Sequence, residues 1–393
     1  MEAIVLNKDF ESVALIDNYK SFIWTERFDE NGEFELHIPI GESVLEYIQK
    51  GFYIWKQDSD YTMVIETLNI EFDDEEGAFL SAKGKSLESL LSRRIVWVKR
   101  VFAMDDNAVR PKVQDAIQLL LKENVYDTGS ATRNIPNFIF ERSDDPKITE
   151  LEFEGEYLGQ NMYDVVSKLC KEHEIGFKLS YHEYYEHTVE TDEGTSIETV
   201  KNALVFRLIA GVDRSYEQTE NPYVIFSPEF ENILNTKYLD SDSSLKNVVL
   251  VVGKSTYNED GTEETREQEV FYIQNTPYYG LDRREIFVDA TSLSTDDGYG
   301  GELSPERYHA QLKQKGIDAL MENTTIIATD GELDGSEGYV YRQDYFIGDI
   351  VQIADEYGHE GQAYVSEYVM TSDNTGIKAC PTFKAIQKGV YET

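Results

Sequence analysis

The first third of the chain alternates apolar and polar residues with a period of two. Between residues 33 and 40, the apolar members are Phe34, Leu36, Ile38 and Ile40. Asn31 and Gly32 precede this run and form a favoured two-residue hairpin turn. Further apolar runs lie at residues 3–6, 12–16, 20–28, 51–56, 61–72 and 78–82. Short strands at this spacing predict a β-barrel or a β-sandwich.

Three later segments repeat their apolar residues at helical spacing. They follow Pro111, Asn161 and the pair Ser304–Pro305, residue types that favour a helix start. The apolar stripes are Val113, Ile117, Leu120 and Leu121; Met162, Val165, Val166, Leu169 and Cys170; and Tyr308, Leu312, Ile317 and Leu320. Residues 175–181 predict a strand, and residues 182–201 predict an exposed hairpin or a flexible loop. The second quarter of the chain is therefore predicted to be α+β.

Residues 204–252 form a different kind of segment. A strand pattern stops at Gly211, a polar loop follows, and Asn221–Pro222 signals a turn. Apolar runs then recur at residues 223–226 and 248–252. We interpret this segment as a seam, where the chain completes one β-domain before starting another.

The C-terminal part of the chain echoes the N-terminal part. The run at residues 51–55 and the run at residues 348–353 each start with glycine and lead through a polar turn into a long predicted strand. Each long strand ends at a glycine-containing turn, at residues 73–77 and 372–376. This pattern predicts two related β modules, although hairpin chemistry alone could produce the same likeness.

Charge and cysteine content narrow the function classes. The 393 residues carry 75 acidic and 36 basic side chains, a net charge of −39. Such a surface repels phosphates, so it disfavours a DNA-reading protein but not a surface that DNA slides past. Solubility or salt adaptation would also explain the charge. The two cysteines form no disulfide framework or zinc spacing, which favours folding in a reducing cytoplasm, and no signal peptide or membrane span is predicted.

The densest basic cluster is the sequence RRIVWVKR at residues 93–100. It has two interpretations. One is a surface for an acidic partner, possibly another copy of the same protein. The other is an edge strand protected by positive charges.

The candidate chemistry is weak. His182 and His187 flank two glutamates without the spacing that places two imidazoles on one helix face, so a solvated hairpin is favoured over a metal site. Cys170 has His173 nearby, but it lies on an apolar helix stripe, which favours a buried thiol. Acidic loops at Asp260, Asp296–Asp297 and residues 330–334 could hold calcium, and turn chemistry explains them equally well. We predict no enzyme and no catalytic, cofactor-binding or metal-binding residues.

Three segments carry a resemblance to a known family. They are GKSLESLLSRRIVWVKR at residues 84–100, GVDRSYEQTENPYVIFSPEFENI at residues 211–233 and LKNVVLVVG at residues 245–253. They resemble the tail-associated hub proteins of siphophages and prophages, and the resemblance extends over essentially the whole chain. It implies a β-rich α+β fold, in which two β-barrels related to tail-tube subunits are each interrupted by a smaller insertion.

On that plan the chain divides into six parts. Residues 1–95 begin the first barrel, residues 96–202 form an α+β insertion, and residues 203–243 return to the first barrel. Residues 244–290 begin the second barrel, residues 291–324 form a helical insertion, and residues 325–393 complete the second barrel. The chain ends soon after its last predicted strand, which favours a hub without a receptor-binding or wall-cutting extension.

The resemblance also implies an assembly. Three copies would form a ring that caps a hexameric tail tube at the tail tip or baseplate of a virion made in the host cytoplasm. The expected partners are the distal tail protein or tail tube, the tape-measure protein, and a tail fibre, receptor-binding or lysin protein. No cofactor, stable nucleic acid binding or direct membrane anchor is expected, because DNA would only pass through the lumen. The alternatives are a cell-wall hydrolase or peptidase used in penetration and a carbohydrate-binding adhesion module.

Overall fold

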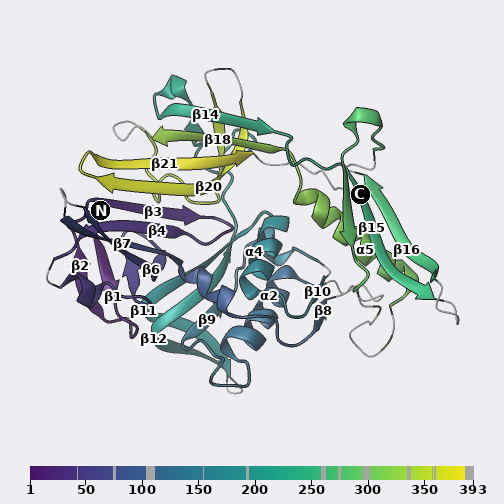
Figure 1. Cartoon of the computed structure of the whole chain (residues 1–393), viewed down its shortest axis with the longest axis horizontal. Helices are drawn as coiled ribbons and strands as arrows, with labels where there is room; N and C mark the ends of the chain where they lie inside the picture. Colours follow the sequence, from purple (N-terminus) through teal and green to yellow (C-terminus); the bar gives the residue numbers. More distant parts are fainter. Residues whose placement is uncertain are drawn as a thin grey trace.

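The computed structural model describes residues 1–41, 43–73, 77–102, 111–153, 155–191, 194–257, 263–272, 276–293, 295, 301, 303–333, 338–355, 357 and 360–385. One long curved β-sheet runs through the body of the molecule, an α+β unit packs below it, and a smaller lobe projects to one side (Figure 1). The fold is β-rich α+β, as predicted.

The N-terminal 86 residues form the first β module. Its strands are β1 (Ala3–Leu6), β2 (Ser12–Ile16), β3 (Ser21–Arg27), β4 (Glu33–Pro39), β5 (Tyr53–Trp55), β6 (Thr62–Asp73) and β7 (Gly77–Ser86), with the short helix α1 (Val44–Tyr47). They lie in the order β3-β4-β7-β6-β5-β1-β2. The period-two pattern of β4 is confirmed, because Phe34, Leu36 and Ile38 are buried. They join a core that includes Phe22 and Trp24.

A second β module combines a middle segment with the C-terminal part of the chain. Its strands are β13 (Ile225–Phe226), β14 (Ile233–Ser241), β18 (Ile326–Leu333), β19 (Ile350–Ala354), β20 (Glu360–Asp373) and β21 (Gly376–Ala385), with the short 3₁₀-helix η3 (Pro228–Phe230). The order is β14-β18-β21-β20, and β19 pairs with both β20 and β13. Its core gathers around Phe226, Tyr345 and Phe383.

The predicted likeness between the two ends of the chain has a structural counterpart. Gly51 and Gly348 both have positive φ angles, of 81° and 88°. Each leads into a short strand, β5 or β19, which pairs antiparallel with a long strand, β6 or β20. Each long strand then forms a hairpin, with β7 or β21. The two modules therefore share a strand arrangement as well as a sequence pattern.

Strand β20 pairs with β3, so the two modules form one sheet of 13 strands. Among the described residues, the strand order runs from β14 to β2 and no pair closes it into a barrel. We predicted that residues 203–243 return to the first barrel, but their described strands do not pair with strands of the first module. Residues 203–209 belong to a hairpin strand of the α+β unit, β13 pairs with β19, and β14 pairs with β18. Alternation fixes which face of a strand is buried, but it does not specify the partner strand.

The α+β unit lies between the modules in sequence. Its elements are the 3₁₀-helix η1 (Leu87–Arg93), β8 (Arg100–Phe102), α2 (Val113–Leu121), the π-helical turn η2 (Lys122–Tyr126), β9 (Phe138–Glu141), α3 (Pro146–Thr149), β10 (Gly155–Tyr157), α4 (Met162–Glu172), β11 (Gly176–Thr191) and β12 (Gly194–Ile209). Both predicted helices are confirmed. The Asn161 side chain caps α4 by accepting a hydrogen bond from the Tyr163 N–H. Residues 182–191 and 194–201 extend the β11–β12 hairpin, so the hairpin interpretation of this segment is confirmed.

The projecting part, which we call the side lobe, consists of β15 (Val248–Tyr257), β16 (Glu263–Tyr272), β17 (Glu285–Asp289), the 3₁₀-helix η5 (Gly280–Asp282) and α5 (Pro305–Met321). The predicted Ser304 cap is confirmed, since its hydroxyl accepts from the Arg307 N–H at 3.4 Å. The strands form a separate three-stranded sheet packed on α5. The expectation that residues 244–290 begin a second barrel is therefore wrong in its strand pairing. The predicted hairpin tip at residues 258–261 lies outside the described residues.

Candidate functional site

The β3–β20 boundary is held by a buried carboxylate with a full set of partners. Glu26 on β3 is completely buried. It accepts hydrogen bonds from the Ser59 hydroxyl at 2.6 Å and from the Tyr341 hydroxyl at 2.8 Å, and it pairs with the Arg342 guanidinium at 2.9 Å. Arg342 and Tyr341 belong to the second module, so this ion pair connects the two modules. Burial lowers the pKa of Arg342, but Glu26 outweighs it, and the net pKa of Arg342 is raised.

Phe28 marks the point where three parts of the chain meet. Its backbone N–H donates to Ser366 O of the second module at 3.1 Å, and its carbonyl accepts from the Phe177 N–H of the α+β unit at 3.3 Å. A Cβ at Gly176 would lie 2.5 Å from its ring, and a Cβ at Gly348 would lie 2.2 Å from it. The ring is buried against backbone that only glycine allows to come this close.

The segment at residues 211–214, within the predicted seam, contacts the second module at Asp349, which is nearly fully buried. Its carboxylate accepts from the Val212 N–H at 2.8 Å and pairs with Arg214 at 2.7 Å. A Cβ at Gly211 would lie 1.7 Å from Gly348 O, so a side chain there would prevent the approach. The segment thus crosses from the α+β unit to the second module and remains there.

Several strand edges of the long sheet are open among the described residues, including that of β2 at one end of the strand order and those of β6 and β14. Strand β6 pairs with β5 only at residues 62–64, so among the described residues no strand covers its outer edge from residue 66 to residue 73. Within the part of the chain that the structure describes, β14 pairs with β18 alone. Exposed apolar side chains lie on both strands: Ile70 and Phe72 on β6, and Leu234 and Leu239 on β14. Open apolar edges are places where another chain can add a strand.

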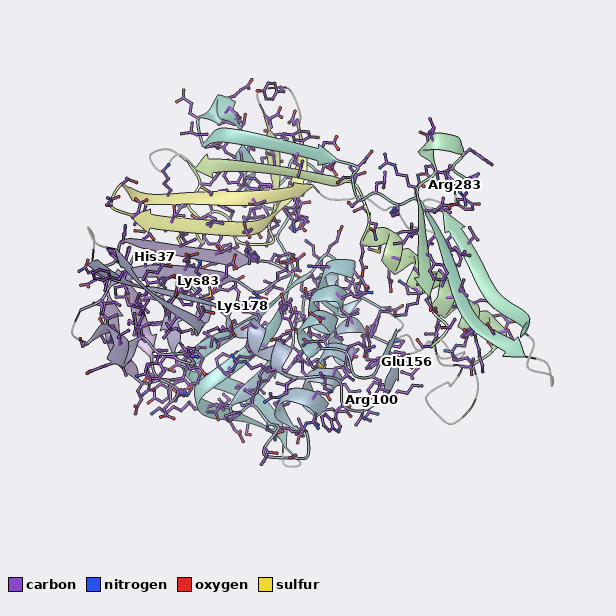
Figure 2. All side chains as sticks on the ribbon, in the orientation of Figure 1. His37, Lys83, Arg100, Glu156, Lys178 and Arg283 are labelled. Atoms are coloured by element: carbon purple, nitrogen blue, oxygen red, sulfur yellow. The ribbon has the colours of Figure 1, made fainter. Side chains whose placement is uncertain are left out.

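A cavity of about 270 Å³ separates the α+β unit from the side lobe. Lys168 of α4 lies there within 3.5 Å of Glu172, 3.7 Å of Asp318 and 3.3 Å of Glu322, the last two on or next to α5. Figure 2 shows Glu156 on the side of the α+β unit that faces the lobe, and it lines the same cavity. Burial raises the pKa of Glu172 to about 7, Asp318 adds to this rise, and Lys168 offsets only part of it.

The sequence candidates for chemistry are scattered. His182 lies on β11 with its Nε2 3.0 Å from the Ser180 hydroxyl, and His187 lies further along the same strand. Cys170 is fully buried, and burial raises the pKa of its thiol well above the ordinary value, as the buried-thiol interpretation predicted. Asp330 lies in β18 opposite Thr382, whereas Asp260, Asp296 and Asp297 lie outside the described residues. Within the described ranges, no three His, Cys, Asp or Glu side chains gather to hold a metal ion, and no helix is long and apolar enough to cross a membrane.

The family model for the Siphovirus ReqiPepy6 Gp37-like protein matches residues 2–383. The chain belongs to this siphovirus tail protein family. That confirms the resemblance described from its three sequence segments.

Two solved structures share the fold. A 43 kDa tail protein of prophage MuSo2 from Shewanella oneidensis is 9% identical, with a TM-score of 0.54 over 98% of this chain and 97% of that chain. A tail protein from Neisseria meningitidis MC58 is 12% identical, with a TM-score of 0.54 over 99% of this chain and 97% of that chain. No curated protein matches the chain in sequence.

Sequence reasoning missed the residues that join the modules. Glu26 is one of 75 acidic side chains, and only its burial distinguishes it. Gly348 carried a signal, because it starts the run that echoes Gly51. No sequence signal pointed to Lys168, because its partners Asp318 and Glu322 lie about 150 residues later in the sequence.

Proposed function

We propose that this protein is the structural hub of a phage or phage-like tail tip, where three copies form a ring that caps the hexameric tail tube. The observation that carries this proposal is the strand order β14-β18-β21-β20-β3-β4-β7-β6. It consists of two four-stranded segments, one from each module, joined side by side in one chain. Two segments in each of three copies make six, which matches the symmetry of a sixfold tube.

Strand direction supports ring closure. Every neighbouring pair in this row of eight strands is antiparallel. Because eight is even, β14 at one end and β6 at the other run in opposite directions. A copy rotated about an axis along the strands would therefore add its β14 antiparallel to this copy's β6. Cyclic head-to-tail contacts of this kind close a ring and would pair the open edges of β6 and β14.

In this proposal residues 1–86 are one tube-like module, and residues 210–243 with 326–385 are the other. The α+β unit and the side lobe extend from them. The ring would connect the tail tube, distal tail protein and tape-measure protein on one side with a fibre, receptor-binding or lysin protein on the host-facing side. The protein would be located in the virion, and its role would not need enzymatic activity.

The net charge of −39 has a use in such a ring. Carboxylates that line the bore would keep the outgoing genome from adhering, since DNA binds proteins largely through cations that neutralise its phosphates. A trimer structure with a neutral or basic bore would disprove this part of the proposal.

The test is the mass of the purified full chain in solution. We expect the mass of three chains, in a concentration-dependent equilibrium with the monomer. Substituting proline for Asn69, inside the open edge of β6, should abolish the trimer, because proline distorts or blocks a strand edge. A wild-type chain that stays monomeric at high protein concentration would contradict the ring.

A further inference from the structure

One exposed patch carries the opposite charge to the molecule as a whole. It consists of Arg93, Arg94, Ile95, Trp97, Val98 and Arg133, and we call it the Trp97 patch. Its three apolar side chains are well exposed: 43% for Ile95, 61% for Trp97 and 51% for Val98. Tryptophan and arginine are the residues most enriched at the centres of protein interfaces.

The patch is held rigidly. The Val96 N–H donates to Gln160 O at 2.9 Å, and the Val96 carbonyl accepts from the Gly159 N–H at 2.8 Å. The Trp97 N–H donates to the Asn124 side chain at 2.8 Å. The backbone is therefore fixed on both sides, and Trp97 is exposed on an ordered frame. A preorganised frame lowers the entropy cost of binding a partner.

Two of the three cations of the patch, Arg94 and Arg133, are available to a partner. The Arg133 guanidinium stacks over the Trp97 ring at 4.7 Å from its centroid. Arg94 Nε donates to the Arg133 carbonyl at 3.1 Å. Within the described residues, neither arginine forms an ion pair with a carboxylate. On a chain with a net charge of −39, this local surplus of positive charge fits an acidic partner.

The patch adjoins the open edge of β6. Arg93 at its border pairs with Glu66 at 3.3 Å, and residue 66 is where that edge becomes uncovered. In the antiparallel seam proposed above, this end of β6 faces the C-terminal end of β14 from the next copy. That end carries the exposed carboxylates of Asp240 and Asp242. The position and sign of charge on the two surfaces are complementary.

We propose that the Trp97 patch is a subunit contact that binds the acidic end of β14 in a second copy of this chain. This inference rests on the proposed ring, and it adds a side-chain contact to the seam. Burial of Trp97 against that copy would account for an aromatic side chain held exposed on a rigid segment.

The test compares trimer dissociation constants of full-length variants. Trp97→Ala should weaken the trimer at least about tenfold, the size expected of an interface hot spot. Arg133→Glu should weaken it too, and adding Asp240→Lys should restore most of the loss by reversing both charges. Tyr279→Ala, an exposed aromatic on the side lobe, and Arg142→Glu, an exposed arginine away from the patch, are the matched controls. Neither control should change the constant.

The outcomes separate the two proposals. A wild-type trimer that is unaffected by Trp97→Ala and Arg133→Glu would overturn the patch contact and leave the ring standing. A monomeric wild type would overturn both. Equal weakening by patch and control variants would assign the effect to folding and overturn the contact. Iodide quenching in a Trp55→Phe background gives a second reading, because Trp24 is fully buried and half-buried Trp55 no longer contributes. The remaining quenchable tryptophan, Trp97, should become protected only in the trimer.

Discussion

Two of the contacts between parts of this molecule are built in opposite ways. At the junction of the β modules, the Glu26 carboxylate is fully buried and bonded to side chains from both modules, and the Phe28 ring fits against glycine backbone. At the contact between the α+β unit and the side lobe, Lys168 faces three carboxylates beside a cavity. There, among the described residues, Glu172 Oε1 has only the ion-pair contact with Lys168 Nζ at 3.5 Å and makes no hydrogen bond, and Arg342 Nε at the module junction makes no hydrogen bond either.

From this difference we infer that the junction of the β modules is rigid and that the contact with the side lobe allows movement. A closely packed, buried junction has one low-energy arrangement, because any shift costs packing and separates a buried carboxylate from its hydrogen-bond partners. A partly exposed ion cluster costs little to separate, since water can replace its contacts. The two β modules should therefore behave as one rigid body, and the side lobe should move relative to them.

The largest effect should follow from removing Arg342. Arg342→Met leaves the Glu26 carboxylate buried without its cation, which costs about 3–5 kcal/mol. Urea denaturation of the full chain should show this loss, and Glu26→Gln added to Arg342→Met should recover part of it. The control is Arg142→Met, because Arg142 pairs with Asp115 at the surface and should cost about 1 kcal/mol or less. Equal losses in the two single variants would contradict the assignment of a special role to Glu26.

The next effect concerns the fit at Phe28. Gly348→Ala combines a positive φ of 88° with a Cβ placed 2.2 Å from the ring, and we expect a loss of about 2–4 kcal/mol. Gly129→Ala is the matched control, because Gly129 has a φ of 72° and nothing within 4 Å. Gly129→Ala therefore measures the cost of backbone strain alone, which should lower the free energy of unfolding by about 1 kcal/mol. If the two alanine variants unfold at the same urea concentration, crowding against Phe28 contributes nothing.

The sequence alone predicted local structure well and long-range pairing poorly, for physical reasons. The Asn161 and Ser304 caps and the alternation at Phe34, Leu36 and Ile38 report contacts within a few residues, so they could be identified without a structure. The pairing of β3 with β20 joins residues 340 or more positions apart, such as Arg27 and Glu367. Any amphipathic strand satisfies the same alternation. The partner is chosen by three-dimensional packing.

The candidate site shows the same limit. The basic run at residues 93–100 could be identified from sequence because its cations are close together in the chain, and two interpretations remained open. Arg133, about 35 residues later, could not be assigned to the patch in this way. In the structure, Ile95 forms an isolated antiparallel bridge with Asn161, and Trp97 is exposed. Neither fact can be read from the local sequence pattern. The assignment of residues 203–243 failed because a chain leaving one module can join either of two similar sheets.

A smaller effect should appear at the side lobe. Lys168→Met removes the cation shared by Glu172, Asp318 and Glu322. Because Lys168 is partly exposed, we expect a loss of about 1 kcal/mol or less in global stability. Amide hydrogen exchange should nevertheless quicken in α5 and at the end of α4, and stay unchanged in β3 and β20. Lys122→Met, an exposed lysine with a distant carboxylate partner, is the control. Faster exchange in β3 would contradict a separately moving lobe.

The smallest effect is a dependence on pH through Glu172. Its pKa is raised by burial and by Asp318 to about 7, above the ordinary value of 4.5. The folded contact therefore holds more protons than the separated one between these values, and its stability falls as the pH rises through 7. Exchange in α5 should quicken from pH 5 to pH 8 once the intrinsic chemical rate is removed. Glu172→Gln should flatten this profile, while Glu174→Gln, at a carboxylate that does not contact Lys168, should leave it in place. An unchanged slope in Glu172→Gln would mean that the lobe contact does not depend on this proton, and that Asp318 or another group sets its response.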